Sequence, residues 1–207
     1  MGLKGEQTRH KILAVAEDLI LKRGYSGTSI DLIIGESGIT KGGFFYHFDG
    51  KNDLAKHLIR RYLEQDEAFF EGLLARSRSL SEDPLQQLLI FLKLMAEAMA
   101  DLPGSHPGCL VASFTYESHQ FDDDIRELNA RGMRHWRSIF LAQLTQIAER
   151  YPMRLEQNLA DVADMLTAVT EGGIVMSRCL QEPGILPSQL LQFRNYVRLL
   201  FSDVTVN

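Results

Sequence analysis

The stretch of residues 36–54, ESGITKGGFFYHFDGKNDL, gathers side chains suited to recognising a polar polymer. Lys41 is well suited to donate to the O6 and N7 atoms of guanine. Tyr46 and His47 can donate hydrogen bonds to phosphate oxygens, which are contacts that fix register without reading bases. The adjacent pair Gly42–Gly43 has no Cβ atoms, so its backbone can come close to a ligand. This combination indicates DNA contact.

These residues need a short helix to position them. Gly24 is predicted to end a first helix, and Thr28, with Asp31 three residues on, indicates the cap of a second. Gly38 marks a turn, after which Thr40 can cap a third helix. Two short helices joined at a glycine are typical of a helix-turn-helix, whose second helix enters the major groove.

The aromatic residues of this stretch are expected to divide between two faces of the third helix. Phe44 and Phe48 are four residues apart and should pack inward, whereas Phe45 and Tyr46 should lie toward the outside. The same pattern also fits a small three-helix subdomain with an aromatic core, and spacing alone leaves that interpretation open.

Helical periodicity continues through most of the remaining chain. The sequence predicts further helices over about 51–78, 84–100, 108–119, 123–150, 156–181 and 188–203. We therefore expect an all-α fold of about nine helices. Its expected division is a helix-turn-helix DNA-binding domain over 1–50 and a ligand-binding and dimerisation domain over 51–207.

Composition narrows the class of protein. The 207 residues carry a net charge of −5, but residues 1–61 hold ten Lys and Arg against seven Asp and Glu, so that part carries +3. A basic end on an acidic chain suggests a polyanion partner. The first residues lack the apolar run of a signal peptide, and no stretch is long enough for a membrane span. With only two cysteines, spaced far apart, a cytoplasmic location is expected.

The residues of this stretch closely resemble the tetracycline-repressor (TetR/AcrR) family of bacterial transcription regulators. The family signature is matched in register by Thr28, Ile33, Gly38, Ile39, Thr40, Gly42, His47, Phe48, Lys51 and Leu54. The resemblance implies a homodimeric repressor that binds a palindromic operator in double-stranded DNA. A small hydrophobic or amphipathic molecule, bound in the body, would spread the two heads and release the operator.

The resemblance also implies which residues touch DNA. Phosphate contacts fall on Thr28, Tyr46, His47 and Lys51, and the positions near bases begin at Thr40. The full expected DNA-binding set is Thr28, Ser29, Thr40, Lys41, Gly42, Gly43, Phe45, Tyr46, His47 and Lys51.

Three positions depart from the family pattern. Phe45 replaces the usual tyrosine, so its phosphate bond is absent and Tyr46 can take over. Ile34 replaces a small alanine at the helix crossing, and Ser37 replaces another alanine and can bond back to its own helix.

Two apolar stripes near the end of the sequence are expected to form the dimer. They could build a four-helix interface with their copies in a second subunit, or both could pack within one chain. The expected interface residues are Leu159, Val162, Leu166, Val169, Gly173, Met176, Leu190, Phe193, Val197 and Leu200.

A mostly apolar pocket with a few polar groups is expected on the middle helices. Its candidate residues are Phe91, Met95, Met99, Phe114, His119, Trp136, Phe140 and Glu171. Each of these also fits plain core, and Glu171 also fits a surface position.

Other functions remain as alternatives. Cys109, after a Pro-Gly bend, could sense oxidants or electrophiles, although a buried cysteine is usually inert. The histidines at 106, 119 and 135 with residues 122–124 match no metal-ligand spacing, so no metal or cofactor is expected. An all-α enzyme with a basic docking head lacks a catalytic motif in this sequence. A nucleoid or architectural DNA-binding protein would need a larger basic surface.

Overall fold

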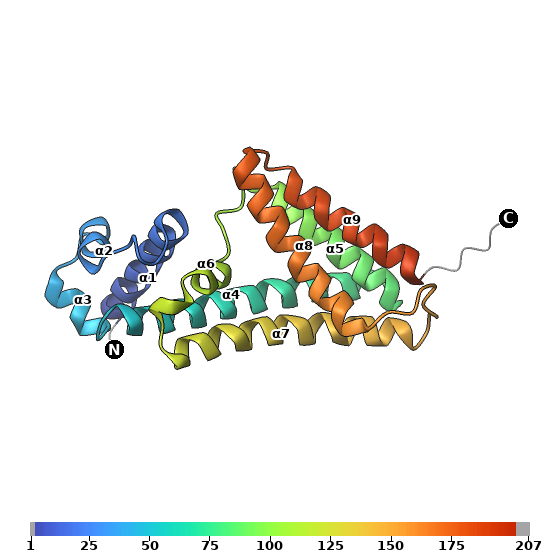
Figure 1. Ribbon diagram of the computed structural model, residues 1–207, viewed down its shortest axis with the longest axis horizontal. Coiled ribbons are helices and arrows are strands. Elements are labelled where there is room, and N and C mark those ends of the chain that lie inside the picture. The colour runs from blue at the N-terminus through green and yellow to red at the C-terminus, as the bar shows by residue number, and fades with distance from the viewer. Residues whose placement is uncertain (1–2, 202–207) are drawn as a thin grey trace. The chain divides into compact units, whose positions relative to one another are not determined.

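The computed structural model describes residues 3–201, and within that range the chain forms nine α-helices, one short 3-10 helix and no strand (Figure 1). The all-α prediction is confirmed. The elements are α1 (Leu3–Arg23), α2 (Ile30–Ser37), α3 (Lys41–His47), α4 (Lys51–Leu80), α5 (Pro84–Ala100), α6 (Leu110–Tyr116), η1 (Ser118–Gln120), α7 (Asp123–Ala148), α8 (Leu159–Leu180) and α9 (Ile185–Phe201). None of these helices is long and apolar enough to cross a membrane.

The short helices begin and end at residues whose chemistry explains the boundary. Gly24 follows α1 with φ +77° and Gly38 follows α2 with φ +64°, which are left-handed conformations that favour glycine. The Thr40 hydroxyl accepts from the Gly43 amide and caps α3, as predicted. The cap of α2 is Ser29, whose hydroxyl accepts from the Leu32 amide. The prediction that Thr28 caps this helix is wrong.

The described chain forms two compact units. The first, called the head here, contains residues up to 66 together with 107–132, and the second, called the body, contains 67–106 and the residues from 133 onward. Helices α4 and α7 therefore each contribute to both units. This division differs from the boundary expected at residue 50, because later segments complete the apolar core of the head.

The head has one apolar core built from both of its segments. Helix α1 packs against α2 and α6, and α2 against α3. Side chains from 110–125 share the core with those of residues 12–59. The fully buried members include Ile12, Ile20, Ile33, Phe44, Leu58, Leu110 and Ile125.

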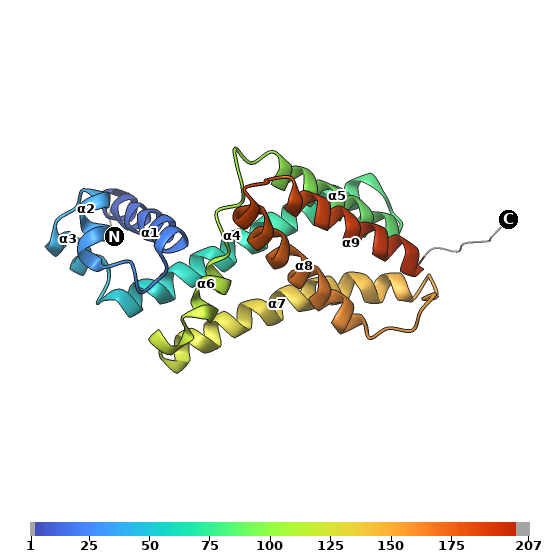
Figure 2. The same ribbon diagram turned by 45° about the horizontal axis from the view of Figure 1, so that its top comes forward.

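In the body, α9 lies alongside both α5 and α8, as Figures 1 and 2 show from two directions. Apolar stripes on these helices face one another. A trio of aromatic rings, Phe70, Phe91 and Phe140, lies elsewhere in the core of the body, with ring centroids 5.5–6.3 Å apart. Apolar burial on this scale is the main stabilising term for helices packed in layers.

Candidate nucleic-acid interface

Helix α3 has one face in the core of the head and one face in solvent. Phe44 and Phe48 are buried, while Phe45 is 45% exposed and Tyr46 is 73% exposed. The predicted division of the aromatic residues is therefore confirmed. Phe45 and Tyr46 are adjacent in the chain, so their exposed rings offer apolar and hydrogen-bonding surface side by side. The buried pair holds the helix down, which leaves the outer pair at the surface.

The first turn of α3 is open to solvent. Lys41 and Gly42 are exposed, and an added Cβ at Gly42 would meet nothing within 4 Å. Gly43 is half-buried, and its amide donates to the Thr40 hydroxyl at 3.0 Å. The residues that follow Lys41 in this turn are glycines, so neither has a side chain that blocks the approach of a ligand to Lys41 or to the backbone.

Two residues expected at phosphates have contacts within the head. Thr28 is fully buried, and its hydroxyl donates to the Gly24 carbonyl at 2.9 Å, so it lies outside the exposed surface. Lys51 is half-buried, and its Nζ donates to the Tyr25 carbonyl at 2.5 Å while lying 4.0 Å from the Tyr25 ring centroid. Burial lowers the pKa of Lys51, against an opposing effect of the Glu117 carboxylate.

The remaining candidates near α3 lie at its margins. Ser29 is exposed, but its hydroxyl caps α2. His47 is half-buried, and its ring packs edge-on against that of Tyr46. Its Nδ1 is buried and has no hydrogen-bond partner among the described residues. Ser37 donates to the Ile33 carbonyl at 2.5 Å, as expected for a serine that bonds back to its own helix.

The predicted pocket residues are not one cluster. Phe91, Met95, Trp136 and Phe140 are buried in the body and Met99 is half-buried there. Phe114 instead belongs to the core of the head, where it stacks on Phe121 with ring centroids 4.6 Å apart. His119 is exposed and bonds to its neighbour Gln120. The assignment of Phe114 and His119 to a pocket in the body is therefore corrected.

The body has an open groove between α7 and α8, with a volume of about 340 Å³. One wall is the ion pair of Arg137 and Asp164, in which two nitrogens of the arginine donate to the two carboxylate oxygens at 2.6 and 2.5 Å. The groove is lined by Met133, Arg134, Arg137, Asp164, Thr167, Ala168 and Glu171. Only Glu171 belongs to the predicted pocket set.

The stripes predicted to form a dimer face mostly into their own chain. Val162 and Leu166 on α8, with Leu190, Phe193, Val197 and Leu200 on α9, are buried within the single chain, and Leu159 and Val169 are half-buried. An added Cβ at Gly173 would lie 2.9 Å from the side chain of Leu186, so this glycine permits the α8–α9 contact. Of the predicted set only Met176 is exposed. The other residues of the predicted interface agree with the alternative, in which both stripes pack within one chain.

The groups considered for redox or metal chemistry have structural positions. Cys109 is buried, and its Sγ accepts from the Ala112 amide at the start of α6. Cys179 is exposed, and no disulfide is formed within residues 3–201. In the same range, no group of three or more His, Cys, Asp or Glu side chains could hold a metal ion. Burial disfavours the thiolate that an electrophile sensor needs.

Two sequence families cover most of the chain. A model described as "Bacterial regulatory proteins, tetR family" matches residues 12–58, and one described as "Transcriptional regulator LmrA/YxaF-like, C-terminal domain" matches 84–188. The chain belongs to the TetR family of transcriptional regulators. The first match contains α2 and α3 and the second runs from α5 into α9, so the exposed face of α3 is that of a TetR helix-turn-helix.

Known relatives agree with this assignment to the TetR family. The chain is 29% identical to the HTH-type transcriptional regulator LmrA of Bacillus subtilis over 174 residues, which covers 82% of this chain and 86% of LmrA. A TetR transcriptional regulator from Chloroflexus aurantiacus shares the fold with a TM-score of 0.81 and 24% identity, covering 97% of this chain and 98% of that chain. A TetR-family regulator from Agrobacterium tumefaciens has a TM-score of 0.77 and 22% identity, covering 96% and 100%. These proteins are regulators of transcription rather than enzymes.

Sequence reasoning missed a group of polar residues around the α1–α2 turn. Glu117, Asn52 and Tyr25 meet there in the head, although Glu117 is more than ninety residues from Tyr25 in the chain. The only local signal was that Glu117 lies near a helix end, which is common for acidic residues. A long-range contact of this kind requires the fold to be known.

Proposed function

We propose that this TetR-family chain is a ligand-responsive repressor that binds a palindromic operator as a homodimer in the cytoplasm. The observation that carries the proposal is the exposed face of α3, where Lys41, bare glycine backbone and Tyr46 lie together on a helix anchored by buried phenylalanines. A base-reading lysine beside a phosphate-binding tyrosine is an arrangement that can give both specificity and affinity.

In this proposal Lys41 reads a base and Tyr46 donates to phosphate. Thr28 and Lys51 are omitted from the proposed contact set, because each is held inside the head by a bond to backbone. Ser29, Thr40, Phe45 and His47 remain at its margins. The exposed edge of Phe45 can meet sugar or a thymine methyl group.

For the dimer we propose the outer faces of α8 and α9 in place of the buried stripes. Exposed apolar side chains on α8 are Met165, Val175, Met176 and Leu180, and α9 adds Leu199. Gly172 lies on the outside of α8, where an added Cβ would meet nothing within 4 Å, so a second helix could approach closely. An exposed apolar patch of this kind is a common interaction site.

For the effector we propose the groove between α7 and α8. Its apolar stems and its charged side chains of both signs suit a small amphipathic molecule. By linkage, a ligand that weakens operator binding must itself be bound more weakly by the operator complex, by the same factor. Thr167→Trp should narrow the groove and reduce release by ligand, while leaving operator affinity unchanged. Thr145→Trp, an exposed site on α7 away from the groove, is the control.

The experiment that tests the proposal is selection of bound fragments from the source genome, followed by binding measurements on the selected DNA. Lys41→Ala should weaken binding by roughly 1–3 kcal/mol per half-site and relax the preference at one base pair. Lys22→Ala is the matched control, because Lys22 pairs with Asp18 on α1 and away from α3.

Tyr46→Phe should weaken binding to all sequences alike, and Tyr116→Phe, at the other highly exposed tyrosine of the head, should not. A protein that selects no fragment, or a Lys41→Ala variant with unchanged base preference and affinity, would contradict the proposed function. A second set of measurements should use a compound screen, in which released DNA reports an effector.

A further inference from the structure

Tyr25, in the turn between α1 and α2, is hydrogen-bonded both to α4 and to the residue that follows α6. Tyr25 donates its amide N–H to Glu117 at 2.6 Å and its hydroxyl to Asn52 at 2.9 Å, and its carbonyl accepts from Lys51 at 2.5 Å. Its ring packs on Phe121, with centroids 4.5 Å apart. Every polar group of Tyr25 thus has a partner, and the partners come from α4 and from the end of α6.

Glu117 makes the most bonds to this turn. Besides the Tyr25 amide, its carboxylate accepts from the Ser26 amide at 2.8 Å and from the Ser26 hydroxyl. Burial tends to raise the pKa of Glu117, but the bonds from Ser26 and Tyr25 and the charge of Lys51 outweigh it and hold the pKa below its usual value. Glu117 is therefore an ionised acceptor for two successive backbone amides.

Gly24 shows how closely the carboxylate approaches. An added Cβ at this position would lie 2.8 Å from Oε1 of Glu117, and the backbone has φ +77°. Any other residue type would be strained there and would also meet the carboxylate. The α1–α2 turn is thus shaped around the side chain of Glu117.

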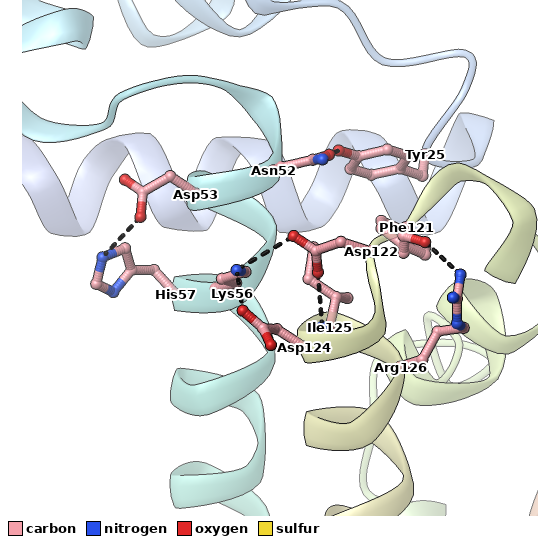
Figure 3. Close-up of polar contacts among 10 residues, drawn as sticks. All are labelled: Tyr25, Asn52, Asp53, Lys56, His57, Phe121, Asp122, Asp124, Ile125 and Arg126. Carbon is pink, nitrogen blue, oxygen red and sulfur yellow. Dashed lines mark hydrogen bonds and ion pairs between the residues drawn. The ribbon is translucent and has the colours of Figure 1, made fainter.

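A second contact fastens the same corner of the head to α4. Figure 3 shows Lys56 on α4 between Asp122 and Asp124, with Nζ to oxygen distances of 3.2 and 3.0 Å. Asn52 lies one turn earlier on α4, bonded to Tyr25 in the same view. The residues after α6 are therefore tied both to the α1–α2 turn and to α4, which leaves Glu117 little freedom to move.

The turn determines where the helix-turn-helix begins. The Thr28 hydroxyl bonds back to the Gly24 carbonyl, and the next residue, Ser29, caps α2. Helix α2 packs on α3, which has the proposed DNA contacts. The backbone at residues 24–26 is therefore linked through Thr28 and Ser29 to the start of α2, and through α2 to α3.

We propose that Glu117 is a positioning residue for operator binding, which acts by holding the amides of Tyr25 and Ser26 and so keeps α2 and α3 in the DNA-binding arrangement. This inference rests on the proposed function. Glu117 touches no DNA in this scheme. Its loss lowers the fraction of heads that are competent to bind, and the apparent affinity falls by that fraction.

The test uses the full-length chain and the DNA fragment that the wild-type protein selects from genomic DNA. The amides of Tyr25 and Ser26 each donate to a different oxygen of Glu117, so Glu117→Gln replaces one of these two acceptors with an NH2 donor and removes the negative charge. We expect operator affinity to fall about tenfold, which is the scale of one lost bond to a charged acceptor. Glu64→Gln is the matched control, since Glu64 is an exposed carboxylate of the head with no hydrogen bond or ion pair to the described residues.

A spectroscopic signature separates positioning from a general loss of stability. In Glu117→Gln the amide protons of Tyr25 and Ser26 should exchange at least about tenfold faster and move upfield in NMR spectra, while the amides of α4 keep wild-type exchange. Ser26→Ala removes only the hydroxyl bond and should weaken operator binding about threefold. In the Glu117→Gln background it should add nothing further, because both substitutions act on one contact.

The outcomes distinguish the two proposals. A wild-type chain that selects no DNA contradicts the proposed function, and the exchange rates of Tyr25 and Ser26 then report on the contact alone. A wild-type chain that binds, with Glu117→Gln binding equally well, overturns the role of Glu117 and leaves the proposed function intact. If Glu117→Gln does not fold, the test rests on Ser26→Ala. Wild-type operator affinity in Ser26→Ala would then overturn the role of Glu117 as a positioning residue.

Discussion

The helix-turn-helix of the head and the α5–α8–α9 layer of the body are held together by different means. Helices α2 and α3 have 8 and 7 residues, far below the length at which an isolated helix is stable, and each begins at a side-chain cap. Helices α8 and α9 have 22 and 17 residues and bury long apolar stripes against their neighbours. Side-chain caps therefore set where the short helices of the head begin while an apolar core holds them in place, whereas the long helices of the body are joined mainly along their apolar stripes.

The largest expected effect tests the body. Leu166→Glu places a charge at a position that is 1% exposed, so we expect loss of about 4 kcal/mol or more of stability, enough to abolish the cooperative thermal transition of the body. Val175→Glu, on the same helix but 54% exposed, should change stability by only about 0.5 kcal/mol. Circular dichroism measures both.

Light scattering on the same two variants tests the revised dimer surface. Val175→Glu should shift the mass from about twice 23.4 kDa toward one chain while keeping its helical signal. A dimeric Val175→Glu variant with a folded but monomeric Leu166→Glu variant would restore the buried stripe as the interface.

The second prediction tests how much the apolar core contributes to the stability of the head. Phe44 is fully buried under α3, and Phe44→Ala should lower the free energy of unfolding by roughly 3–5 kcal/mol. Phe45→Ala, on the exposed side of the same helix, should cost much less. Urea denaturation of the two variants compares them directly, and similar losses would show that the two faces of α3 are not distinct.

The third prediction uses the polar network of the head. The pKa of Tyr25 is raised from the ordinary value of 10.0 to about 12. Burial is the largest cause, and the negative charges of Asp122 and Glu117 add to it. Because the folded state holds the phenolic proton more tightly than the unfolded chain, this stabilisation is complete below about pH 10 and is lost as pH rises toward 12. Thermal melts across that window should show a smaller decline in Tyr25→Phe. An equal decline in the variant would assign the effect to other groups.

The smallest expected effect concerns one cap. Thr40→Ala leaves the Gly43 amide without its side-chain acceptor and should destabilise the head by about 1 kcal/mol. Thr40→Ser keeps the hydroxyl and should retain most of the stability. If Thr40→Ala melts like the wild type, the cap does not contribute and the contrast between head and body is weaker than described.

The sequence predicted the features that depend on neighbouring residues. Helix ends at Gly24 and Gly38, the Thr40 cap and the two faces of α3 all follow from local conformation and periodicity, and the structure confirms them. Thr28 was wrongly predicted as the cap in place of Ser29, since adjacent hydroxyls are equivalent by pattern and the burial of Thr28 depends on the rest of the head.

Features that depend on distant residues could not be predicted. The stripes containing Leu166 and Val197 were expected to form a dimer interface, but these side chains are buried within the single chain, because periodicity does not say whether the covering surface belongs to the same chain or to another. Similarly, the sequence alone does not say whether the ammonium group of Lys51 donates to a phosphate or to a carbonyl of its own chain. Its bond to Tyr25 depends on a turn that Glu117 shapes from 92 residues away.

The two-segment composition of the head has a consequence for the order in which the protein folds. On the ribosome, residues up to 66 emerge first, but Leu110, Phe114, Phe121 and Ile125, which complete the same core, follow only after the whole of α5. At about 5–20 residues per second this leaves the first three helices waiting for several seconds with apolar surface uncovered. Until residue 125 has emerged, the nascent head exposes apolar surface of the kind that aggregates, and a fragment that stops at residue 66 would keep that surface uncovered.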